Sequence, residues 1–273
     1  MKRPRTRAAL LLGTFLVAVL KTLRCTRTID YVTCTIERVG GDQTNGGYGA
    51  WPTCVNLITD KPTIWSFGVG CDTTFELDLR NRFHEAKIIS FDPTIDRERF
   101  ELCMQRSLRA FGEPDTQNVV SVFSKIGLAN YSGRVSFKKS NDPRIGSKSI
   151  AHGIRDTSGK EYKSDDAAAN FVEVQSLKSL YTIYGLHHSS VDDYALDILK
   201  IDIEGAEFDV IPAWCSSGFH PRVKQILIEF HDRLFDEGMH KRQVVYVCLR
   251  DLGYVLVYEN VPSKEEVVFI HIG

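Results

Sequence analysis

The stretch LDILKIDIEGAEFDVI, residues Leu196–Ile211, decides the fold of this chain. It begins as an apolar run that carries Asp202 and Glu204, and it breaks at Gly205. A continuous Ile/Leu run of this length is typical of a strand buried on both faces, as in a parallel sheet. A helix is predicted to follow over 206–214. Acids at the carboxyl end of such a strand stand where open α/β sheets bind ligands, although solvated acids at a strand exit have the same pattern.

Outward from this stretch the chain alternates between strand and helix patterns. Strands are predicted over 63–69, 87–91, 118–123, 171–174, 195–203, 223–230, 254–259 and 266–272. Helices are predicted over 72–83, 96–111, 177–186, 206–214 and 237–252. This alternation indicates βαβ units, a mostly parallel sheet and helices on both faces. The last two strands have no helix between them, so they must pair as an antiparallel hairpin.

Size and composition exclude several classes of protein. The chain has 273 residues, a formal net charge of −1 and 43% hydrophobic residues, which suits a sizeable folded core. Outside the N-terminus there is no basic tract, and there is no zinc-ligand spacing. These features argue against nucleic acid as a partner.

The N-terminus differs from the rest. Met1–Arg7 is strongly basic, and the apolar run Ala8–Leu20 follows. A helix of this length spans about 20 Å, short of the about 30 Å of a bilayer core, and fits the apolar region of a signal peptide. Because the flank has no small-x-small cleavage site, residues 1–24 are interpreted as a short signal anchor, with a cleaved signal peptide as the alternative. The hypothesis is a single-pass protein whose main domain lies in the ER or Golgi lumen, or else a secreted one.

Residues 25–56 contain a cluster of turn formers, GGDQTNGGYGAWP, and are predicted to be a stem and a capping loop. The domain proper is predicted over 57–273.

The seven cysteines show no CxxC motif, and their odd number leaves at least one free or paired between chains. Cys25 and Cys34 are candidates for either fate, several of the others are interpreted as buried small residues, and the disulfide pairing stays open. The triplet at Asn130 is an N-glycosylation acceptor and gives weak support for a lumenal domain.

Two strand ends indicate a nucleoside pocket. The first predicted strand ends in Phe67-Gly68-Val69-Gly70, and glycines there let the backbone approach a ligand closely. The second ends in Asp92, 22 residues after Gly70. That offset is close to the roughly 20 residues between a glycine turn and a carboxylate that binds ribose hydroxyls. Together the two landmarks predict an adenosine-containing cofactor.

The cofactor is either a dinucleotide or S-adenosylmethionine. A dinucleotide fingerprint places a third glycine at position 73, where this chain has Thr73. The C-terminal hairpin also disfavours a dinucleotide fold of parallel strands. S-adenosylmethionine has no pyrophosphate and tolerates the loss of this glycine.

Four segments carry a resemblance to class I methyltransferases, and within them to the FkbM-like group and related membrane-anchored methyltransferase-like proteins. They are IWSFGVGCDTTFE (Ile64–Glu76), IISFDP (Ile88–Pro93), LDILKIDIEGAEFDVI (Leu196–Ile211) and QILIEFH (Gln225–His231). The resemblance implies a Rossmann-like, seven-stranded, mostly parallel sheet whose seventh strand is antiparallel and inserted beside the fifth. It also implies methyl transfer from S-adenosylmethionine, usually to an oxygen.

By the same resemblance, Phe67–Gly70 would hold the methionine end and the adenosine, and Asp92 the ribose. Asp202 and Glu204 would line the reaction cleft. Many class I enzymes have an acid where this chain has Ser66, and Asp72 is the candidate that replaces its charge.

Proton removal from the acceptor calls for a base beside the cofactor. Asp202, Glu204, Glu229 and His231 all follow or end neighbouring strands, and His231 alone has an ordinary pKa near neutrality. The alternative for His231 is a packing or helix-cap histidine. Two carboxylates in i, i+2 spacing do not define a metal site, so no metal ligand is assigned and a divalent metal stays open.

The sequence therefore predicts an S-adenosylmethionine-dependent O-methyltransferase of the secretory pathway. Its partners would be a small-molecule or glycan acceptor and the membrane through the N-terminal segment. One alternative is a non-catalytic binding domain with a methyltransferase fold. An NAD-type oxidoreductase is a further alternative, disfavoured by Thr73 and the terminal hairpin.

Overall fold

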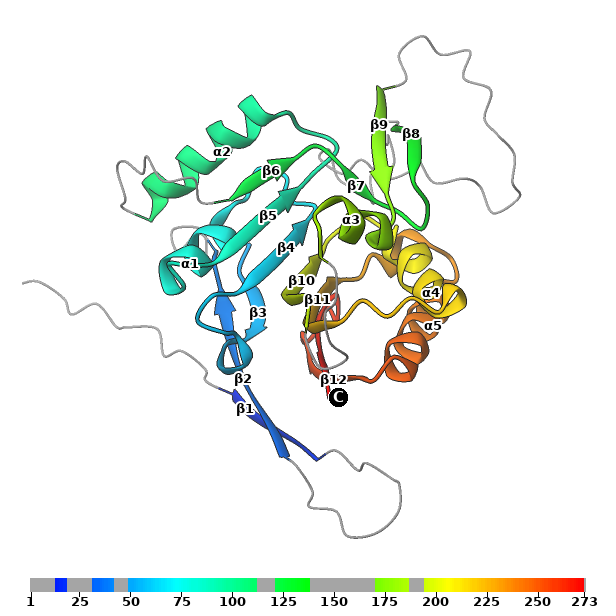
Figure 1. Cartoon of the computed structure of the whole chain (residues 1–273). Helices are drawn as coiled ribbons and strands as arrows, with labels where there is room; N and C mark the ends of the chain where they lie inside the picture. Colours follow the sequence, from blue (N-terminus) through cyan, green and yellow to red (C-terminus); the bar gives the residue numbers. More distant parts are fainter. Residues whose placement is uncertain are drawn as a thin grey trace, which may run out of the picture.

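A seven-stranded sheet forms the centre of the computed structural model, which describes residues 13–18, 31–41, 49–111, 121–137, 170–186 and 194–272 (Figure 1). In spatial order its strands are β12 (Tyr254–Glu259), β13 (Glu266–His271), β11 (Val223–Glu229), β10 (Leu196–Ile201), β4 (Thr63–Phe67), β5 (Lys87–Phe91) and β6 (Val122–Ser124). The strands from β11 to β6 are parallel, and β13 is antiparallel to both of its neighbours. The predicted α/β fold with an antiparallel C-terminal hairpin is confirmed.

The parallel register brings the strand ends to one edge. Strand β10 is central and all six of its residues are buried, as its mostly apolar sequence predicts. Its Ile201 pairs with Phe67 of β4 and with Ile228 of β11, and Phe67 pairs with Phe91 of β5. The residues that follow these four positions therefore leave the sheet side by side.

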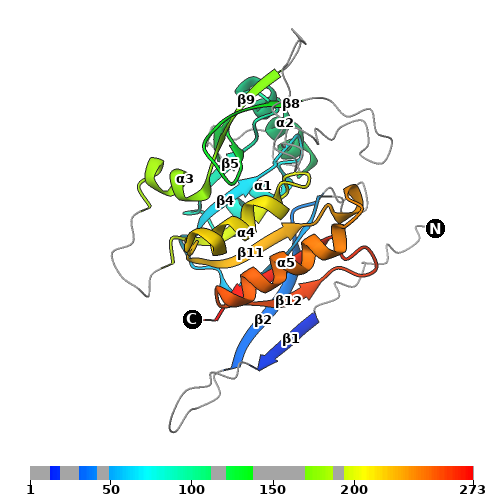
Figure 2. The ribbon, with the colours of Figure 1, turned by 90° about the vertical axis from the view of Figure 1, so that its right-hand side faces the viewer.

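Helices cover both faces of the sheet, as predicted. They are α1 (Thr74–Arg82), α2 (Arg97–Ala110), α3 (Leu177–Ile183), α4 (Glu207–Ser217) and α5 (Gly238–Asp251). Trp65 of β4 belongs to a buried cluster with side chains of α3, α4 and α5, whereas its neighbour Ile64 belongs to a second cluster with Phe75 of α1. This alternation is expected for a strand buried on both faces. Figure 2 shows α4 and α5 lying along one face.

The described part of residues 25–56 is a second, smaller sheet rather than the expected stem and capping loop. Strand β2 (Tyr31–Val39) pairs antiparallel with β3 (Trp51–Cys54), and both supply buried side chains to the cluster that contains Ile64. The side chain of Gln225 hydrogen-bonds both the amide (3.0 Å) and the carbonyl (3.1 Å) of Cys54. The alternating side chains of β2 and β3 thus bury against the main sheet, and the expectation is corrected for these residues.

Residues 13–18 of the N-terminal apolar run form strand β1 (Gly13–Ala18), which pairs antiparallel with β2. The rest of residues 1–24, predicted as a signal anchor or signal peptide, lies outside the described residues. Among the helices of the described part, none has the length and apolar character to cross a bilayer.

Six cysteines form three disulfides, Cys34–Cys54, Cys71–Cys103 and Cys215–Cys248. The interpretation of several of them as unpaired buried residues, and of Cys34 as free or linked to another chain, is therefore wrong. The partners lie 20 to 33 residues apart in sequence and meet only in the folded chain. Cys25 lies outside the described residues.

A third sheet stands above the carboxyl edge of the main sheet, where Figure 1 shows β8 and β9. It consists of β7 (Gly127–Leu128), β9 (Asn170–Gln175) and β8 (Gly133–Phe137), in that order. The strand predicted over 171–174 lies within β9, and residues 138–169 lie outside the described part.

Candidate functional site

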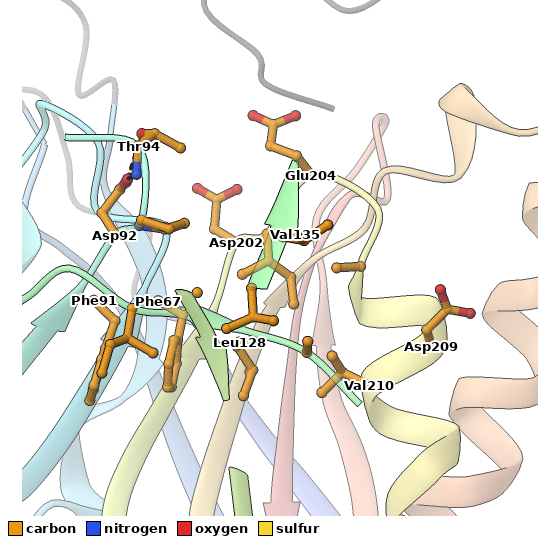
Figure 3. Close-up of a pocket in the computed structure, with 18 of the residues that line it drawn as sticks. Phe67, Phe91, Asp92, Thr94, Leu128, Val135, Asp202, Glu204, Asp209 and Val210 are labelled. Atoms are coloured by element: carbon orange, nitrogen blue, oxygen red, sulfur yellow. Dashed lines mark hydrogen bonds between the residues drawn. The ribbon is translucent and has the colours of Figure 1, made fainter. Parts of the chain in front are cut away.

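A cavity of about 200 Å³ opens at the carboxyl edge of β4, β5 and β10, beneath the β7–β9–β8 sheet (Figure 3). The rings of Phe67 and Phe91 form part of its wall and are stacked with centroids 4.3 Å apart. Leu128, Val135 and Val174 line it from the small sheet. The cavity thus combines an apolar wall with polar groups at strand ends, as ligand sites commonly do.

Asp92 and the glycine turn meet at this cavity. The amide of Gly70 donates a 2.7 Å hydrogen bond to Oδ2 of Asp92, and the amide of Gly68 donates to the Phe91 carbonyl at 2.9 Å. Oδ1 of Asp92 accepts from the amide (2.8 Å) and hydroxyl (2.5 Å) of Thr94. The two landmarks of the sequence analysis are therefore in direct contact, and both line the same cavity.

The glycines at 68 and 70 have different structural roles. Gly68 has φ +74°, and a Cβ there would lie 1.6 Å from the backbone oxygen of Asp202. Gly70 has φ +56°, and a Cβ there would meet nothing within 4 Å. Gly68 thus permits the close approach of β4 and the turn after β10, whereas Gly70 leaves space in the cavity that it lines.

Two residues predicted to bind the cofactor are not brought into the cavity. Val69 is buried in a cluster with Leu77 and Phe100. The carboxylate of Asp72 accepts hydrogen bonds from the amide (3.0 Å) and hydroxyl (2.6 Å) of Thr74, and Asp72 is not among the lining residues. Asp72 therefore does not place a charge at the cavity wall in place of Ser66.

The turn after β10 carries Asp202 and Glu204 into the mouth of the cavity, where Figure 3 shows both carboxylates. Glu204 has φ +53°, a conformation unfavourable for a residue with a side chain, and Gly205 follows with φ +100°. The tight turn therefore aims Glu204 at the cavity. Lys200 lies close to the first of these acids: its Nζ is 3.8 Å from Oδ2 of Asp202 and 4.2 Å from the ring centroid of Trp51.

His231 lies behind these acids and does not line the cavity. It is 1% exposed, and its Nε2 is 3.5 Å from Oε2 of Glu204 and 3.7 Å from Oδ1 of Asp202. Oε1 of Glu229, the last residue of β11, is 3.9 Å from the same nitrogen. The four residues named in the sequence analysis as candidates for proton removal thus form one group, called here the acid–histidine cluster.

Burial and mutual charge perturb the cluster. Burial raises the pKa of Asp202, although the positive charges of Lys200 and His231 lower it in part. Burial also raises the pKa of Glu204, and the charge of His231 lowers it in part. Burial and the neighbouring Asp202 raise the pKa of Glu229 to about 7. Burial opposes the charged imidazole, but its hydrogen bond to Glu207 and the surrounding carboxylates raise the pKa of His231 to about 9. When no ion or ligand is bound to the cluster, the imidazole of His231 is therefore a cation at neutral pH.

Glu207, which the sequence analysis did not single out, holds His231 in place. It is 0% exposed, and its Oε1 accepts from the His231 amide (2.8 Å) and lies 3.3 Å from Nδ1. Its Oε2 accepts from the amide of Gly205 at 2.9 Å. An acid in the first turn of a helix is favoured by the helix dipole, so in the sequence Glu207 is indistinguishable from an ordinary helix start.

Comparisons with known proteins give the family. A family model described as a methyltransferase FkbM domain matches residues 69–256, more than half of the chain. No curated protein sequence matches. Similar solved structures include a chain of a fibrillarin/Nop5p complex (10% identity, TM-score 0.37, covering 79% of this chain and 75% of that one). Another is an O-methyltransferase family protein from Burkholderia thailandensis (12% identity, TM-score 0.31, covering 77% and 50%). On the match over 69–256, the chain belongs to the FkbM methyltransferase family.

Proposed function

We propose that this methyltransferase binds S-adenosylmethionine in the cavity beside Asp92 and methylates an oxygen of an acceptor that enters at Asp202 and Glu204. The observation that carries the proposal is the 2.7 Å hydrogen bond between Gly70 and Asp92, which joins two strand ends at the wall of one cavity. The carboxylates of Asp202 and Glu204 line the same cavity.

The residues around the cavity fit a nucleoside cofactor. Phe67 and Phe91 offer apolar surface, Gly70 leaves open space, and Asp92 keeps acceptor capacity for hydroxyls, since a carboxylate has about four lone-pair sites and three are occupied here. When bound, S-adenosylmethionine supplies a methyl group that its sulfonium makes electrophilic. The protein then has to position the acceptor oxygen and take its proton.

The mouth of the cavity suits an acceptor rich in hydroxyl groups. Carboxylates accept hydrogen bonds from hydroxyls, and Asp202 and Glu204 present theirs at the mouth. Their raised pKa values make them better proton acceptors than solvated acids. A glycan is the proposed acceptor class, because sugars carry several hydroxyls close together.

We assign the domain to the lumen of the secretory pathway. Three disulfides support this assignment, because disulfides persist in oxidising compartments. Asn130, the acceptor of the glycosylation triplet, is exposed at the cavity rim. In microsomes, a C-terminal tag should resist added protease until detergent is present; digestion without detergent would overturn the assignment.

Calorimetry on the purified chain tests the function. S-adenosylhomocysteine is expected to bind and NAD is not, and labelled S-adenosylmethionine is expected to transfer its methyl group to a hydroxylated saccharide. Binding without transfer to any saccharide or small hydroxylated acceptor would favour a non-catalytic binding domain. Binding of NAD alone would favour an oxidoreductase, and binding of neither would overturn the cofactor proposal.

A further inference from the structure

The acid–histidine cluster has the donor set of a metal centre. Asp202 follows β10, Glu229 ends β11 and His231 lies two residues beyond, so three functional groups come from two adjacent strand ends. One ligand atom from each of these residues lies within 4.8 Å of the other two. Because the two strands are paired in register, with Ile201 opposite Ile228, this arrangement is fixed by the sheet.

The spacing in the cluster is longer than that of hydrogen bonds. From Nε2 of His231 to the carboxylate oxygens the distances are 3.5, 3.7 and 3.9 Å, beyond the roughly 2.7–3.2 Å of an N–H···O bond. Three carboxylates also converge on a nitrogen that carries at most one proton. Two ligands of one transition-metal ion, each bound at about 2.0–2.2 Å, stand roughly 3–4 Å apart. The distances between Nε2 of His231 and the carboxylate oxygens therefore fit a metal ion bound between them better than a shared proton.

Glu207 fixes the direction of the imidazole. Its buried carboxylate is held by the amides of His231 and Gly205 and lies 3.3 Å from Nδ1, so Nδ1 is the donor of that contact. The neutral imidazole then carries its lone pair on Nε2, which faces Asp202 and Glu229. A carboxylate on the far nitrogen is the usual support of a metal-binding histidine.

The geometry points to a divalent transition-metal site formed by Asp202, Glu229 and Nε2 of His231, with Glu207 as its positioning residue. One imidazole with two carboxylates suits an ion such as Mn²⁺ or Zn²⁺ better than Ca²⁺, which takes oxygen ligands. Asp202 also lines the cavity, so the ion would bind an acceptor oxygen there and favour loss of its proton. This last role rests on the proposed function, whereas the site itself does not.

Calorimetry of the chelator-treated full chain with MnCl₂, ZnCl₂ and CaCl₂ tests the site. Mn²⁺ or Zn²⁺ is expected to bind once per chain, at least about tenfold more tightly than Ca²⁺. Equal affinity for Ca²⁺ would overturn the role of the histidine, and no binding of Mn²⁺ or Zn²⁺ would overturn the site.

Variants locate the ion. Glu229→Gln and Asp202→Asn keep the side-chain shape and are expected to weaken binding about tenfold or more, and Glu207→Gln by about 10–100-fold. Asp209→Asn, which neutralises another cavity-lining acid on α4, is the matched control and is expected to keep the affinity. Unchanged affinity in both ligand variants would overturn the assignment. Should one variant fail to fold by circular dichroism, the other decides.

Metal binding and cofactor binding are measured separately, so the two proposals fail separately. Metal binding without S-adenosylhomocysteine binding would support the metal site and overturn the proposed function. S-adenosylhomocysteine binding without metal binding would support the proposed function and overturn the metal site.

Discussion

The amide of Gly70 donates a 2.7 Å hydrogen bond to Oδ2 of Asp92, which ties the turn after β4 to the end of β5. Asp92 is only 4% exposed, and its other oxygen holds Thr94. The same carboxylate therefore shapes the cavity wall and, in the proposed function, binds the ligand, so any variant of Asp92 changes both the wall and that binding.

Asp92→Ala is expected to weaken binding of S-adenosylhomocysteine by about 1–3 kcal/mol, because hydrogen bonds to a charged group are lost. It should also lower the free energy of unfolding by about 1–3 kcal/mol, since the amides of Gly70 and Thr94 lose their acceptor. Calorimetry and urea denaturation measure the two effects.

Asp96→Ala is the matched control for this prediction. Asp96 is the N-cap of α2 and accepts from the Arg99 amide at 2.8 Å, so its loss should cost about 1 kcal/mol of stability without changing ligand affinity. If a folded Asp92→Ala protein keeps wild-type affinity, Asp92 does not bind the ligand.

The two cavity glycines should respond differently to alanine. Gly68→Ala places a methyl group 1.6 Å from the backbone oxygen of Asp202 and should lower the melting temperature strongly, because the backbone must shift. Gly70→Ala meets open space and should cost only about 1–2 kcal/mol for its positive φ. Since Gly70 lines the cavity, its variant should nevertheless bind S-adenosylhomocysteine more weakly. Thermal melts and calorimetry of both variants check this. Equal melting temperatures of the two variants would contradict the prediction.

Much of the main sheet could be predicted because each strand carries its own signal. Four of the six residues from Leu196 to Ile201 are Leu or Ile, and the lack of a helix between β12 and β13 required a hairpin. The positions of Asp92, Asp202 and His231 at one edge follow from parallel strands of matching register. These features are local patterns or direct consequences of sheet geometry.

The features that were missed depend on contacts distant in sequence. Strand β3 has only four residues and β2 is polar in part, and their burial depends on partners such as Gln225, 171 residues beyond Cys54. The alternation of Cys34 and Ile36 with polar residues was the signal available for β2. Cysteine spacing does not give connectivity, and the contact between Glu207 and His231 joins a helix start to a loop 24 residues later.

Gln225→Leu tests whether the β2–β3 sheet is part of the domain. The change leaves the buried amide and carbonyl of Cys54 without partners, and each should cost about 1–3 kcal/mol of the free energy of unfolding. Gln243→Leu, on α5 with an exposed side chain, is the control and should change little. Urea denaturation decides: equal stabilities of the two variants would contradict the packing described for this segment.

The disulfides predict a thiol count. Alkylation of the denatured, unreduced protein should label at most one of the seven cysteines, because six are paired. Replacing the pair Cys215 and Cys248 by alanine should lower the free energy of unfolding by about 3–4 kcal/mol, from the entropy of the unfolded loop of this length. Intact mass after alkylation and urea denaturation test both statements, and three or more labelled thiols would be the contrary finding.

Glu76 makes stability depend on pH. It is 1% exposed in α1, and burial raises its pKa above the ordinary value against the opposing charge of Lys200. The folded state therefore holds the proton more tightly than the unfolded state does. This contribution to stability is full below the ordinary pKa and is lost as the pH rises through the pKa of the folded state.

Glu76→Gln, which is neutral at every pH, is therefore expected to be more stable than the wild type at neutral pH, with a gain that shrinks toward acidic pH. The hydroxyl of Ser66, which lies beside the Glu76 carboxyl group, offers an acceptor for the new amide. Urea denaturation at about pH 4.5 and about pH 7.5 measures the difference. Glu101→Gln removes an exposed carboxylate from α2 and should have a small effect at both pH values. A Glu76→Gln protein that is destabilised equally at both would show that Glu76 is stabilising as a charged partner of Lys200.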